Sequence, residues 1–333
     1  MKTADSDSVV HAIRYHTKGP PEVLRWEQVD VPPPGTGEVL LKNTAIGTGL
    51  KDIGERQGRY PSPPLPAIPG NAAAATVLEV GRGVEGLRAG DRVVYATLPA
   101  GSYCEQRVLT AERLVRLPDE INDITAAATI NKGITAHFLA HDTYPVRAGE
   151  TVLIHAVAGG VGLLLCQWAK ILGASVIGTA SSEAKALVAA ENGCDHPIVY
   201  TRQDFVSEVK RVTGGTGVSV VYDSVGKDTF SKSLECLQPL GTMVLFGIAS
   251  GHPPPLELMK LDIWTSWYFT RPSFYVYTRS RDDLLTHADA LFKALGSGAL
   301  KVTVSEQYPL RDAAEAHRAI ESRRTTGSVV LVP

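Results

Sequence analysis

The stretch TVLIHAVAGGVGLLLCQWAK, residues 151–170, decides the fold. It begins as a short apolar strand, turns through a glycine-rich segment and continues as an apolar helix. Because glycine lacks a Cβ, the backbone N–H groups of such a turn can approach phosphate oxygens closely, and the amino end of the helix adds its positive dipole. The sequence therefore predicts a seat for a dinucleotide pyrophosphate, formed by Gly159, Gly160, Val161 and Gly162.

The glycine turn departs from the usual G-x-G-x-x-G pattern, because Val157 occupies the position of the first glycine. Taken alone, the turn also fits a parallel sheet that binds no ligand. The residues that follow favour a ligand site. A break at Gly173-Ala174 and a short strand at 175–179 complete a βαβ unit of ordinary length.

Composition narrows the class of protein. The chain has 333 residues, of which 44% are hydrophobic, so it can form two ordinary domains without disulfides. Its 33 basic and 35 acidic side chains give a net charge of −2, which predicts no nucleic-acid partner and no membrane surface. Its four cysteines form no C-x-x-C pair, so neither a zinc ribbon nor a redox dithiol is expected; they are Cys104, Cys166, Cys194 and Cys236. A small-molecule substrate fits this composition best.

Targeting signals are not apparent in the sequence. The amino-terminal stretch MKTADSDSVVHAIRY is polar, where a secretory signal has an apolar run of roughly seven to fifteen residues. No segment approaches the roughly 18 apolar residues that span a bilayer. The expectation is a cytoplasmic enzyme.

Two patterns divide the chain. Up to about Pro118, β-branched runs alternate with Gly/Pro clusters, which is typical of an all-β lobe. From about Thr125, helices and strands alternate, which predicts an α/β domain with a doubly wound parallel sheet. The strands of this sheet are expected at 152–156, 175–179, 198–200, 218–222 and 242–246.

The end of the chain is expected to return to the β-rich lobe. After Pro272 the pattern predicts a helix at 282–294, a strand near Val302, a helix at 313–322 and a last strand at 328–332. The predicted domains are therefore 1–124, 125–270 and 271–333, with the third completing the first. We expect the active site in the cleft between the lobes, near the carboxyl ends of the parallel strands.

Several strings along the chain resemble the medium-chain dehydrogenase/reductase superfamily, and within it the zeta-crystallin-like NADPH-dependent quinone oxidoreductases. They are AGDRVVYA at 89–96, HAVAGGVGLLLCQWAK at 155–170, VVYDSVGKDTF at 220–230, TRPS at 270–273 and the terminal ESRRTTGSVVLVP. The resemblance covers almost the whole chain. It implies a GroES-like β-rich catalytic lobe, a Rossmann domain and a homodimer.

Zinc-dependent alcohol dehydrogenases share this fold and bind a catalytic metal through a Cys and a G-H-E motif. The corresponding positions here are Gly49 and Gly70-Asn71-Ala72, which offer neither thiolate nor imidazole. The nine histidines are scattered along the sequence. We therefore predict no metal site.

The end of the second strand favours NADPH. An NAD enzyme usually carries Asp or Glu there, whereas this strand ends GTASSEAK. Ser181, Ser182 and Lys185 offer hydroxyls and an ammonium to a 2′-phosphate. Two observations keep the question open: Lys185 could be a solvated helix residue, and Glu183 would oppose phosphate binding unless it points to water.

The resemblance implies further cofactor contacts. It assigns residues around the 2′-phosphate, along the ribose and nicotinamide side, and near the carboxamide. In that order they are Lys185, Tyr200 and Arg323; Ser224, Phe246 and Gly247; and Lys132 with Thr135.

The implied reaction is direct hydride delivery from the nicotinamide to an electron-poor acceptor, a quinone or an α,β-unsaturated carbonyl. No residue is assigned a catalytic role. The predicted substrate-binding residues are Asp52, Tyr60, Asn131 and Thr135. For Asp52 a turn-capping role is an equal alternative.

Three positions lose large side chains relative to the family pattern. Gly49 replaces an asparagine, Gly54 a tyrosine and Ala72 a glutamate, while Asn131 replaces an apolar residue. These changes fit either drift or a pocket widened for a bulky or polycyclic acceptor. They also leave an alternative from another class, a nucleotide-binding protein with a non-redox role in binding or rearranging a biosynthetic intermediate.

Overall fold

The computed structural model describes residues 9–333, and the chain forms two compact units. The first contains the residues up to 131 together with 304–333, and the second contains 132–303. The polar stretch 1–8, part of the segment inspected for a signal, lies outside the described residues. Where the sequence placed boundaries near 124 and 270, the contacts divide the chain near 131 and 303.

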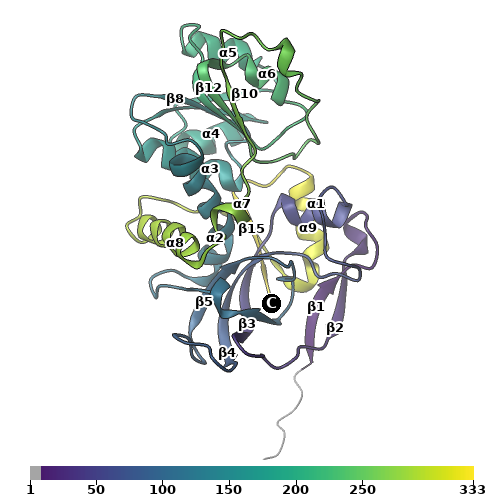
Figure 1. Ribbon diagram of the computed structural model, residues 1–333. Helices are drawn as coiled ribbons and strands as arrows, with labels where there is room; N and C mark the ends of the chain where they lie inside the picture. Colours follow the sequence, from purple (N-terminus) through teal and green to yellow (C-terminus); the bar gives the residue numbers. More distant parts are fainter. Residues whose placement is uncertain (1–8) are drawn as a thin grey trace, which may run out of the picture. The chain divides into compact units, whose positions relative to one another are not determined.

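The first unit is built on a seven-stranded sheet in the order β14-β15-β3-β4-β5-β7, with β6 pairing β3 (Figure 1). The strands are β3 Glu38–Gly47, β4 Ala72–Val80, β5 Arg92–Ala96, β6 Gln106–Thr110, β7 Val115–Arg116, β14 Val304–Pro309 and β15 Ser328–Val332. A separate pair joins β1 Val10–Arg14 to β2 Arg25–Val29. The last strand returns as predicted, because β15 pairs antiparallel with β3.

Two helices of this unit lie side by side in Figure 1, although they come from opposite ends of the chain. They are α1, Leu50–Gln57, and α9, Ala313–Glu321. The helix α2, Asp123–Phe138, begins in the first unit and ends in the second. It passes closely under the sheet, since a Cβ at Gly47 would lie 2.2 Å from the carbonyl oxygen of Ala127.

The second unit is a six-stranded parallel sheet in the order β10-β9-β8-β11-β12-β13, covered by helices (Figure 1). The strands are β8 Thr151–Ile154, β9 Ser175–Ala180, β10 His196–Val199, β11 Val218–Asp223, β12 Leu237–Leu245 and β13 Tyr268–Thr270. The helices include α3 Gly160–Ile171, α4 Glu183–Glu191, α5 Phe205–Val212, α6 Phe230–Leu234, α7 Phe274–Tyr277 and α8 Arg281–Gly296. The five predicted strands are all present, and β13 is an additional edge strand.

This sheet is doubly wound, as the sequence predicted. From β8 the chain proceeds to β9 and β10 on one side, and then crosses back to continue at β11 on the other side of β8. The neighbours β8 and β11 therefore mark the switch point, where ligands bind in folds of this kind. The strand interiors are apolar and fully buried, as at Leu153, Ile177 and Val221.

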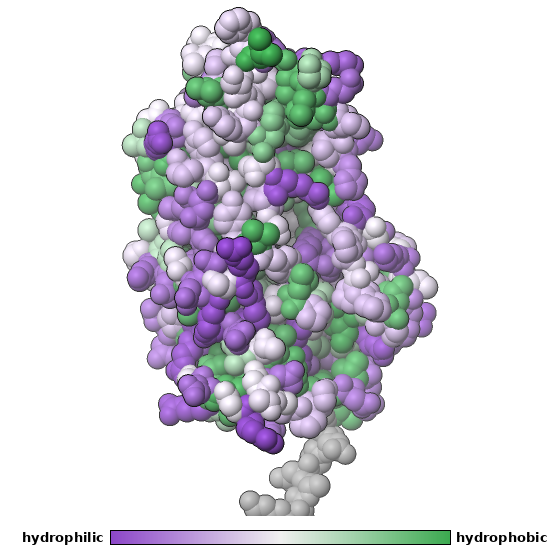
Figure 2. Space-filling view, viewed as in Figure 1, coloured by the Kyte–Doolittle hydropathy of each residue, from purple (hydrophilic) through white to green (hydrophobic). Residues whose placement is uncertain are grey.

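On the face that Figure 2 shows, hydrophobic residues lie in small groups among hydrophilic ones. Within the described residues, no helix is both long and apolar enough to cross a membrane.

Candidate functional site

The glycine turn lies between β8 and α3 and holds the two elements unusually close. Gly159 is the residue before α3, and the helix begins at Gly160. A Cβ at Gly162 would lie 2.5 Å from the carbonyl oxygen of Ala156 and 2.7 Å from that of Val157. Since both are backbone atoms, no side chain fits at position 162. The glycine is required for close helix–strand packing.

Val157, which stands at the position of the first motif glycine, is accommodated by a glycine in the neighbouring strand. Val157 is completely buried. It packs on Gly178 of β9, where a Cβ would lie 2.6 Å from Cγ1 of Val157. The isopropyl group therefore occupies space that a side chain at 178 would fill. This contact was not predicted, although a glycine inside a predicted strand is a recognised sign of close approach.

The predicted cofactor residues of the second unit follow the carboxyl ends of five neighbouring strands. The carboxyl ends of parallel strands meet at one edge of the sheet, so these residues share that edge. In strand order, Tyr200 follows β10, Ser181 and Ser182 follow β9, the turn Gly159–Gly162 follows β8, Ser224 follows β11, and Phe246 and Gly247 follow β12.

The region predicted for the 2′-phosphate is the amino end of α4. Ser182 caps this helix, and its hydroxyl accepts a hydrogen bond of 3.4 Å from the backbone N–H of Lys185. Glu183, whose carboxylate would oppose phosphate binding unless it points to water, forms an exposed ion pair of 3.0 Å with Arg202. Arg202 partly neutralises that carboxylate and adds a cation just beyond Tyr200. Arg202 was not among the predicted cofactor residues.

A buried carboxylate fixes the loop that carries Ser224. The Asp223 side chain is fully buried and accepts hydrogen bonds from the N–H of Gly226 at 3.0 Å and from the hydroxyl of Thr229 at 2.7 Å. A Cβ at Gly247 would lie 2.7 Å from the carbonyl oxygen of Ser224, so the loops after β11 and β12 are in direct contact. Asp223 was not predicted, although an Asp three residues before a loop glycine is typical of a side-chain-supported turn.

The remaining predicted cofactor and substrate residues lie on α2 and after α9. Asn131, Lys132 and Thr135 are half-buried on α2, and Asn131 and Thr135 are one helical turn apart. Arg323 belongs to the first unit, directly after α9, and has a positive φ of 57°.

Asp52 is a buried capping residue of α1. It is 2% exposed, and its Oδ2 accepts hydrogen bonds from the N–H of Gly49 at 2.9 Å and from the Tyr103 hydroxyl at 3.3 Å. Burial, only partly offset by Lys51, raises the pKa of Asp52 to about 7. The geometry therefore matches the capping role that the sequence left open.

The three losses of side-chain volume have different consequences. A Cβ at Gly54 would lie 2.2 Å from Cδ2 of Tyr60, so the tyrosine ring fills the space beside this glycine. The expected widening is therefore wrong at Gly54. Gly49 is different, because a Cβ there would meet only the backbone nitrogen of Lys51, at 4.0 Å. Ala72 is buried in β4.

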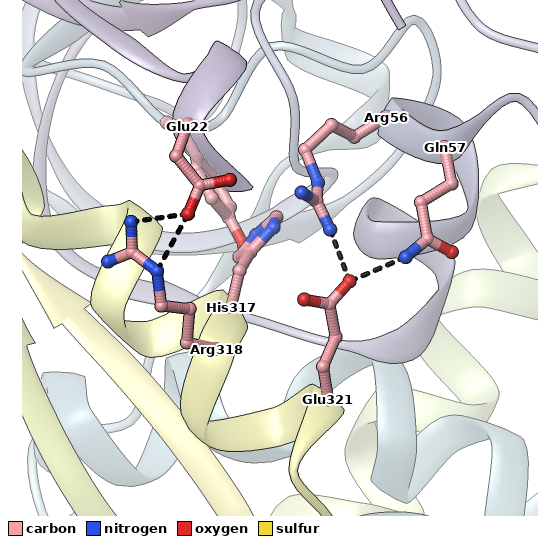
Figure 3. Close-up of polar contacts among 7 residues, drawn as sticks. Glu22, Arg56, Gln57, His317, Arg318 and Glu321 are labelled. Atoms are coloured by element: carbon pink, nitrogen blue, oxygen red, sulfur yellow. Dashed lines mark hydrogen bonds and ion pairs between the residues drawn. The ribbon is translucent and has the colours of Figure 1, made fainter. Parts of the chain in front are cut away.

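A polar network holds α1, which contains Asp52 and directly follows Gly49 (Figure 3). Arg56 of α1 is completely buried and forms an ion pair with Glu321 of α9, which also accepts a hydrogen bond of 2.5 Å from Gln57. Beside this pair, His317 lies 3.1 Å from the Tyr103 hydroxyl, and burial lowers the pKa of the imidazole to about 3. The network links α1 to α9 within the first unit.

The positions that bind catalytic zinc in related folds do not fit a metal here. Gly70 has a φ of 87°, and a Cβ there would lie 2.2 Å from the ring of Tyr103. Asn71 is buried, and Gly49 and Ala72 carry no donor atom on their side chains. Because no thiolate, imidazole or carboxylate occupies these positions, no step of a mechanism can be assigned to zinc there.

Comparison with known families matches both units. Residues 35–146 match the alcohol dehydrogenase GroES-like domain, and residues 160–282 match the family described as zinc-binding dehydrogenase.

Individual proteins resemble the chain over nearly its whole length. A quinone oxidoreductase of Salmonella typhimurium is 46% identical, covering 96% of this chain and 99% of that protein. A 2-haloacrylate reductase of a Burkholderia species is 43% identical, covering 98% and 99%. The crystal structure of Escherichia coli quinone oxidoreductase complexed with NADPH superposes with a TM-score of 0.95 at 43% identity, covering 97% and 100%.

Proposed function

The chain belongs to the quinone oxidoreductases of the medium-chain dehydrogenase/reductase superfamily, and on that basis we propose that it transfers a hydride from NADPH to a quinone or an α,β-unsaturated carbonyl acceptor. It is an NADPH-dependent oxidoreductase. The observation that carries the proposal is the gathering of the predicted cofactor residues at the carboxyl ends of five neighbouring strands, beside the switch point between β8 and β11.

In the proposed reaction the protein binds and orients the reactants. Bound NADPH supplies the hydride, and the conjugated acceptor supplies its own activation. The turn Gly159–Gly162 binds the pyrophosphate through backbone N–H groups, while Ser181, Ser182 and Lys185 bind the 2′-phosphate. Lys132 and Thr135 orient the nicotinamide end from α2. Fixing the reactants in this way lowers the entropic part of the barrier.

For the acceptor, we propose a preference for bulky molecules, for which Gly49 leaves room. The open space around the Cβ position of Gly49 supports this role, whereas Tyr60 occupies the space beside Gly54. Asp52, Tyr60, Asn131 and Thr135 remain the predicted substrate-binding residues. The 2-haloacrylate reductase among the relatives supports a conjugated acceptor as an alternative to a quinone.

A steady-state assay tests the reaction. Purified protein should oxidise NADPH above the no-enzyme rate with benzoquinone, naphthoquinone or phenanthrenequinone, or with an α,β-unsaturated ketone. Tight binding of NADPH without turnover on any of these acceptors would reject the reductase and favour the non-redox alternative.

Gly49→Asn tests the acceptor preference. Position 49 has an extended backbone, φ −162° and ψ 170°, directly before α1, where asparagine is a favourable cap, so the variant should fold. We expect kcat/KM for phenanthrenequinone to fall about tenfold or more relative to benzoquinone, the size of a lost pocket contact of about 1.4 kcal/mol. The control is Gly298→Asn, because asparagine tolerates the positive φ of 74° at that exposed position. An unchanged ratio in Gly49→Asn would contradict the role of Gly49.

We also propose that the protein forms a homodimer through the edge strand β13. Its neighbourhood exposes large apolar side chains: Met259 is 97% exposed, Trp264 82% and Ile263 79%. An apolar surface beside an unpaired strand edge favours pairing with a second copy. Trp264→Lys should shift the protein towards monomer in analytical ultracentrifugation. A wild-type protein that is monomeric at micromolar concentration would reject the proposal.

A further inference from the structure

Three side chains of the second unit converge at one point although they are far apart in the sequence. His137 lies at the end of α2 and His287 in the middle of α8, and their Nδ1 atoms are 2.9 Å apart. Oδ2 of Asp142 lies 3.9 Å from Nδ1 of His287. All three potential ligand atoms are within 4.8 Å of one another. The helices that carry the histidines are tightly packed, since a Cβ at Gly133 of α2 would lie 2.5 Å from the side chain of Leu291 of α8.

A π-helical turn at the end of α2 carries Asp142. After Phe138 the chain continues as a π-helix over Leu139–Thr143, and the N–H of Tyr144 donates to the carbonyl of Leu139 at 3.2 Å. A π-helix is wider than an α-helix, because its hydrogen bonds join residues five apart instead of four. His137 lies in α2 just before this turn, and Asp142, five residues further on, lies within it. Turns of this kind are rare and occur frequently at functional sites.

Burial disfavours the charged form of both histidines. Burial, together with His141 and His287, lowers the pKa of His137 to about 3, and burial also lowers the pKa of His287. Burial therefore favours the uncharged imidazole, which is the form that binds metal ions. They face each other through equivalent nitrogens, of which at most one carries a hydrogen in the metal-free protein.

Surrounding contacts hold the rings in place. His141 stacks on His137 with ring centroids 4.1 Å apart, and Nδ1 of His141 lies 2.9 Å from the His137 carbonyl oxygen, so its N–H donates there. The His287 imidazole forms a further hydrogen bond with the backbone of Tyr277. Such outer contacts orient histidine ligands in metal sites.

We propose that His137, His287 and Asp142 bind one divalent first-row transition metal ion. At metal–nitrogen distances of about 2.1 Å, two ligands at a right angle are about 3.0 Å apart and two at a tetrahedral angle about 3.4 Å apart. The observed 2.9 Å therefore fits adjacent positions of a square-planar or octahedral site. Asp142 is 46% exposed, so its side chain can rotate towards the ion.

The ligand set also defines the class of ion. Two imidazoles and one carboxylate suit Cu²⁺, Ni²⁺ or Zn²⁺ better than Mg²⁺ or Ca²⁺, which prefer oxygen ligands throughout. The 2.9 Å separation favours Cu²⁺ and Ni²⁺ over Zn²⁺, which prefers tetrahedral sites. None of the three residues corresponds to the positions of catalytic zinc, 49 and 70–72. An ion here would join the end of α2 to α8, and the inference does not depend on the proposed reductase activity.

Calorimetric titration of untagged, full-length, chelator-treated protein with NiCl2, CuCl2 or ZnCl2 tests the site. We expect one ion per chain. Asp142→Asn and His137→Gln should each weaken binding at least about tenfold, and His287→Gln should do the same. The control is His252→Gln, which removes an exposed histidine outside the cluster and should leave the affinity unchanged.

Two further measurements separate loss of binding from loss of folding. Asp142 is exposed, so Asp142→Asn should retain the wild-type circular dichroism spectrum and unfolding temperature without metal. Electron paramagnetic resonance of the Cu²⁺ complex should show coupling to two ring nitrogens in the wild type and to one in His137→Gln. The proposal is overturned if the wild type binds no ion at micromolar concentration, or if binding survives in folded His137→Gln and Asp142→Asn, which would assign it to surface histidines.

Discussion

Gly162→Ala is expected to separate the two functions of the glycine turn, packing and phosphate binding. The new Cβ would lie 2.5 Å and 2.7 Å from two carbonyl oxygens of the β8–α3 connection. Because ordinary contact begins near 3.4 Å, the start of α3 must move by about 0.9 Å. Overpacking of this kind costs about 1–3 kcal/mol of stability.

The same displacement affects the cofactor. A hydrogen bond of about 2.9 Å to a phosphate oxygen, lengthened by that amount, exceeds the limit of about 3.2 Å and is lost. A hydrogen bond to a charged group contributes about 1.5–3 kcal/mol, so the Kd for NADPH should rise about 10- to 100-fold. Fluorescence titration with NADPH measures the Kd, and urea unfolding measures the stability.

Gly217→Ala is the matched control for this experiment. Gly217 has a φ of 90°, and a Cβ there would lie 2.7 Å from the backbone nitrogen of Gln238, so alanine should cost at least as much stability. Gly217 precedes β11 and thus lies at the amino edge of the sheet, away from the predicted cofactor residues. We expect its Kd for NADPH to be unchanged. Wild-type affinity in Gly162→Ala, or equal loss of affinity in both variants, would refute the reasoning.

Two further predictions concern charge. Lys185→Glu should weaken binding of NADPH relative to NADH by on the order of 2 kcal/mol or more, because a charge-assisted bond to the 2′-phosphate becomes a repulsion. The ratio of the two Kd values measures this effect, and the exposed Lys293→Glu is the control. Equal loss of affinity for both cofactors would reject the assignment. The second prediction concerns Asp52, whose folded-state pKa of about 7 exceeds its unfolded value of about 3.9. The stability of the wild type should therefore fall as pH rises from about 4 to 7, and Asp52→Asn should remove that loss. His317, with a pKa lowered to about 3, makes stability rise with pH between about 3 and 6.5, so the Asp52 effect is visible only as a difference between the two proteins. Urea unfolding of the wild type and of Asp52→Asn across pH measures that difference. Parallel stability curves would contradict the Asp52 assignment.

The sequence predicted the architecture well because periodicity reports burial directly. The five parallel strands and the terminal strand 328–332 are present, since each is a short apolar run bounded by turn residues. The edge strand β13 was not predicted. It has three residues, Tyr268 and Phe269 are exposed, and its pairing with β12 is visible only in three dimensions.

The candidate site was predictable where residue type alone determines chemistry. The glycine turn and the serines after β9 belong to this group. Contacts between distant residues were not predictable: Gly178 accommodates Val157, Tyr60 fills the space beside Gly54, and Arg202 pairs with Glu183. The histidines illustrate the same limit, because His137 and His287 are 150 positions apart in the sequence, yet their Nδ1 atoms are 2.9 Å apart.

The pairing of β15 with β3 constrains how the protein is made. All strands of the second unit are synthesised by residue 270, so that unit can fold while the ribosome is still adding residues. The first unit cannot, because β15, which pairs with β3, follows the whole second unit in the sequence. Until residues 328–332 have been synthesised, that edge of β3 lacks this partner, and nascent chains are exposed there to wrong strand pairing.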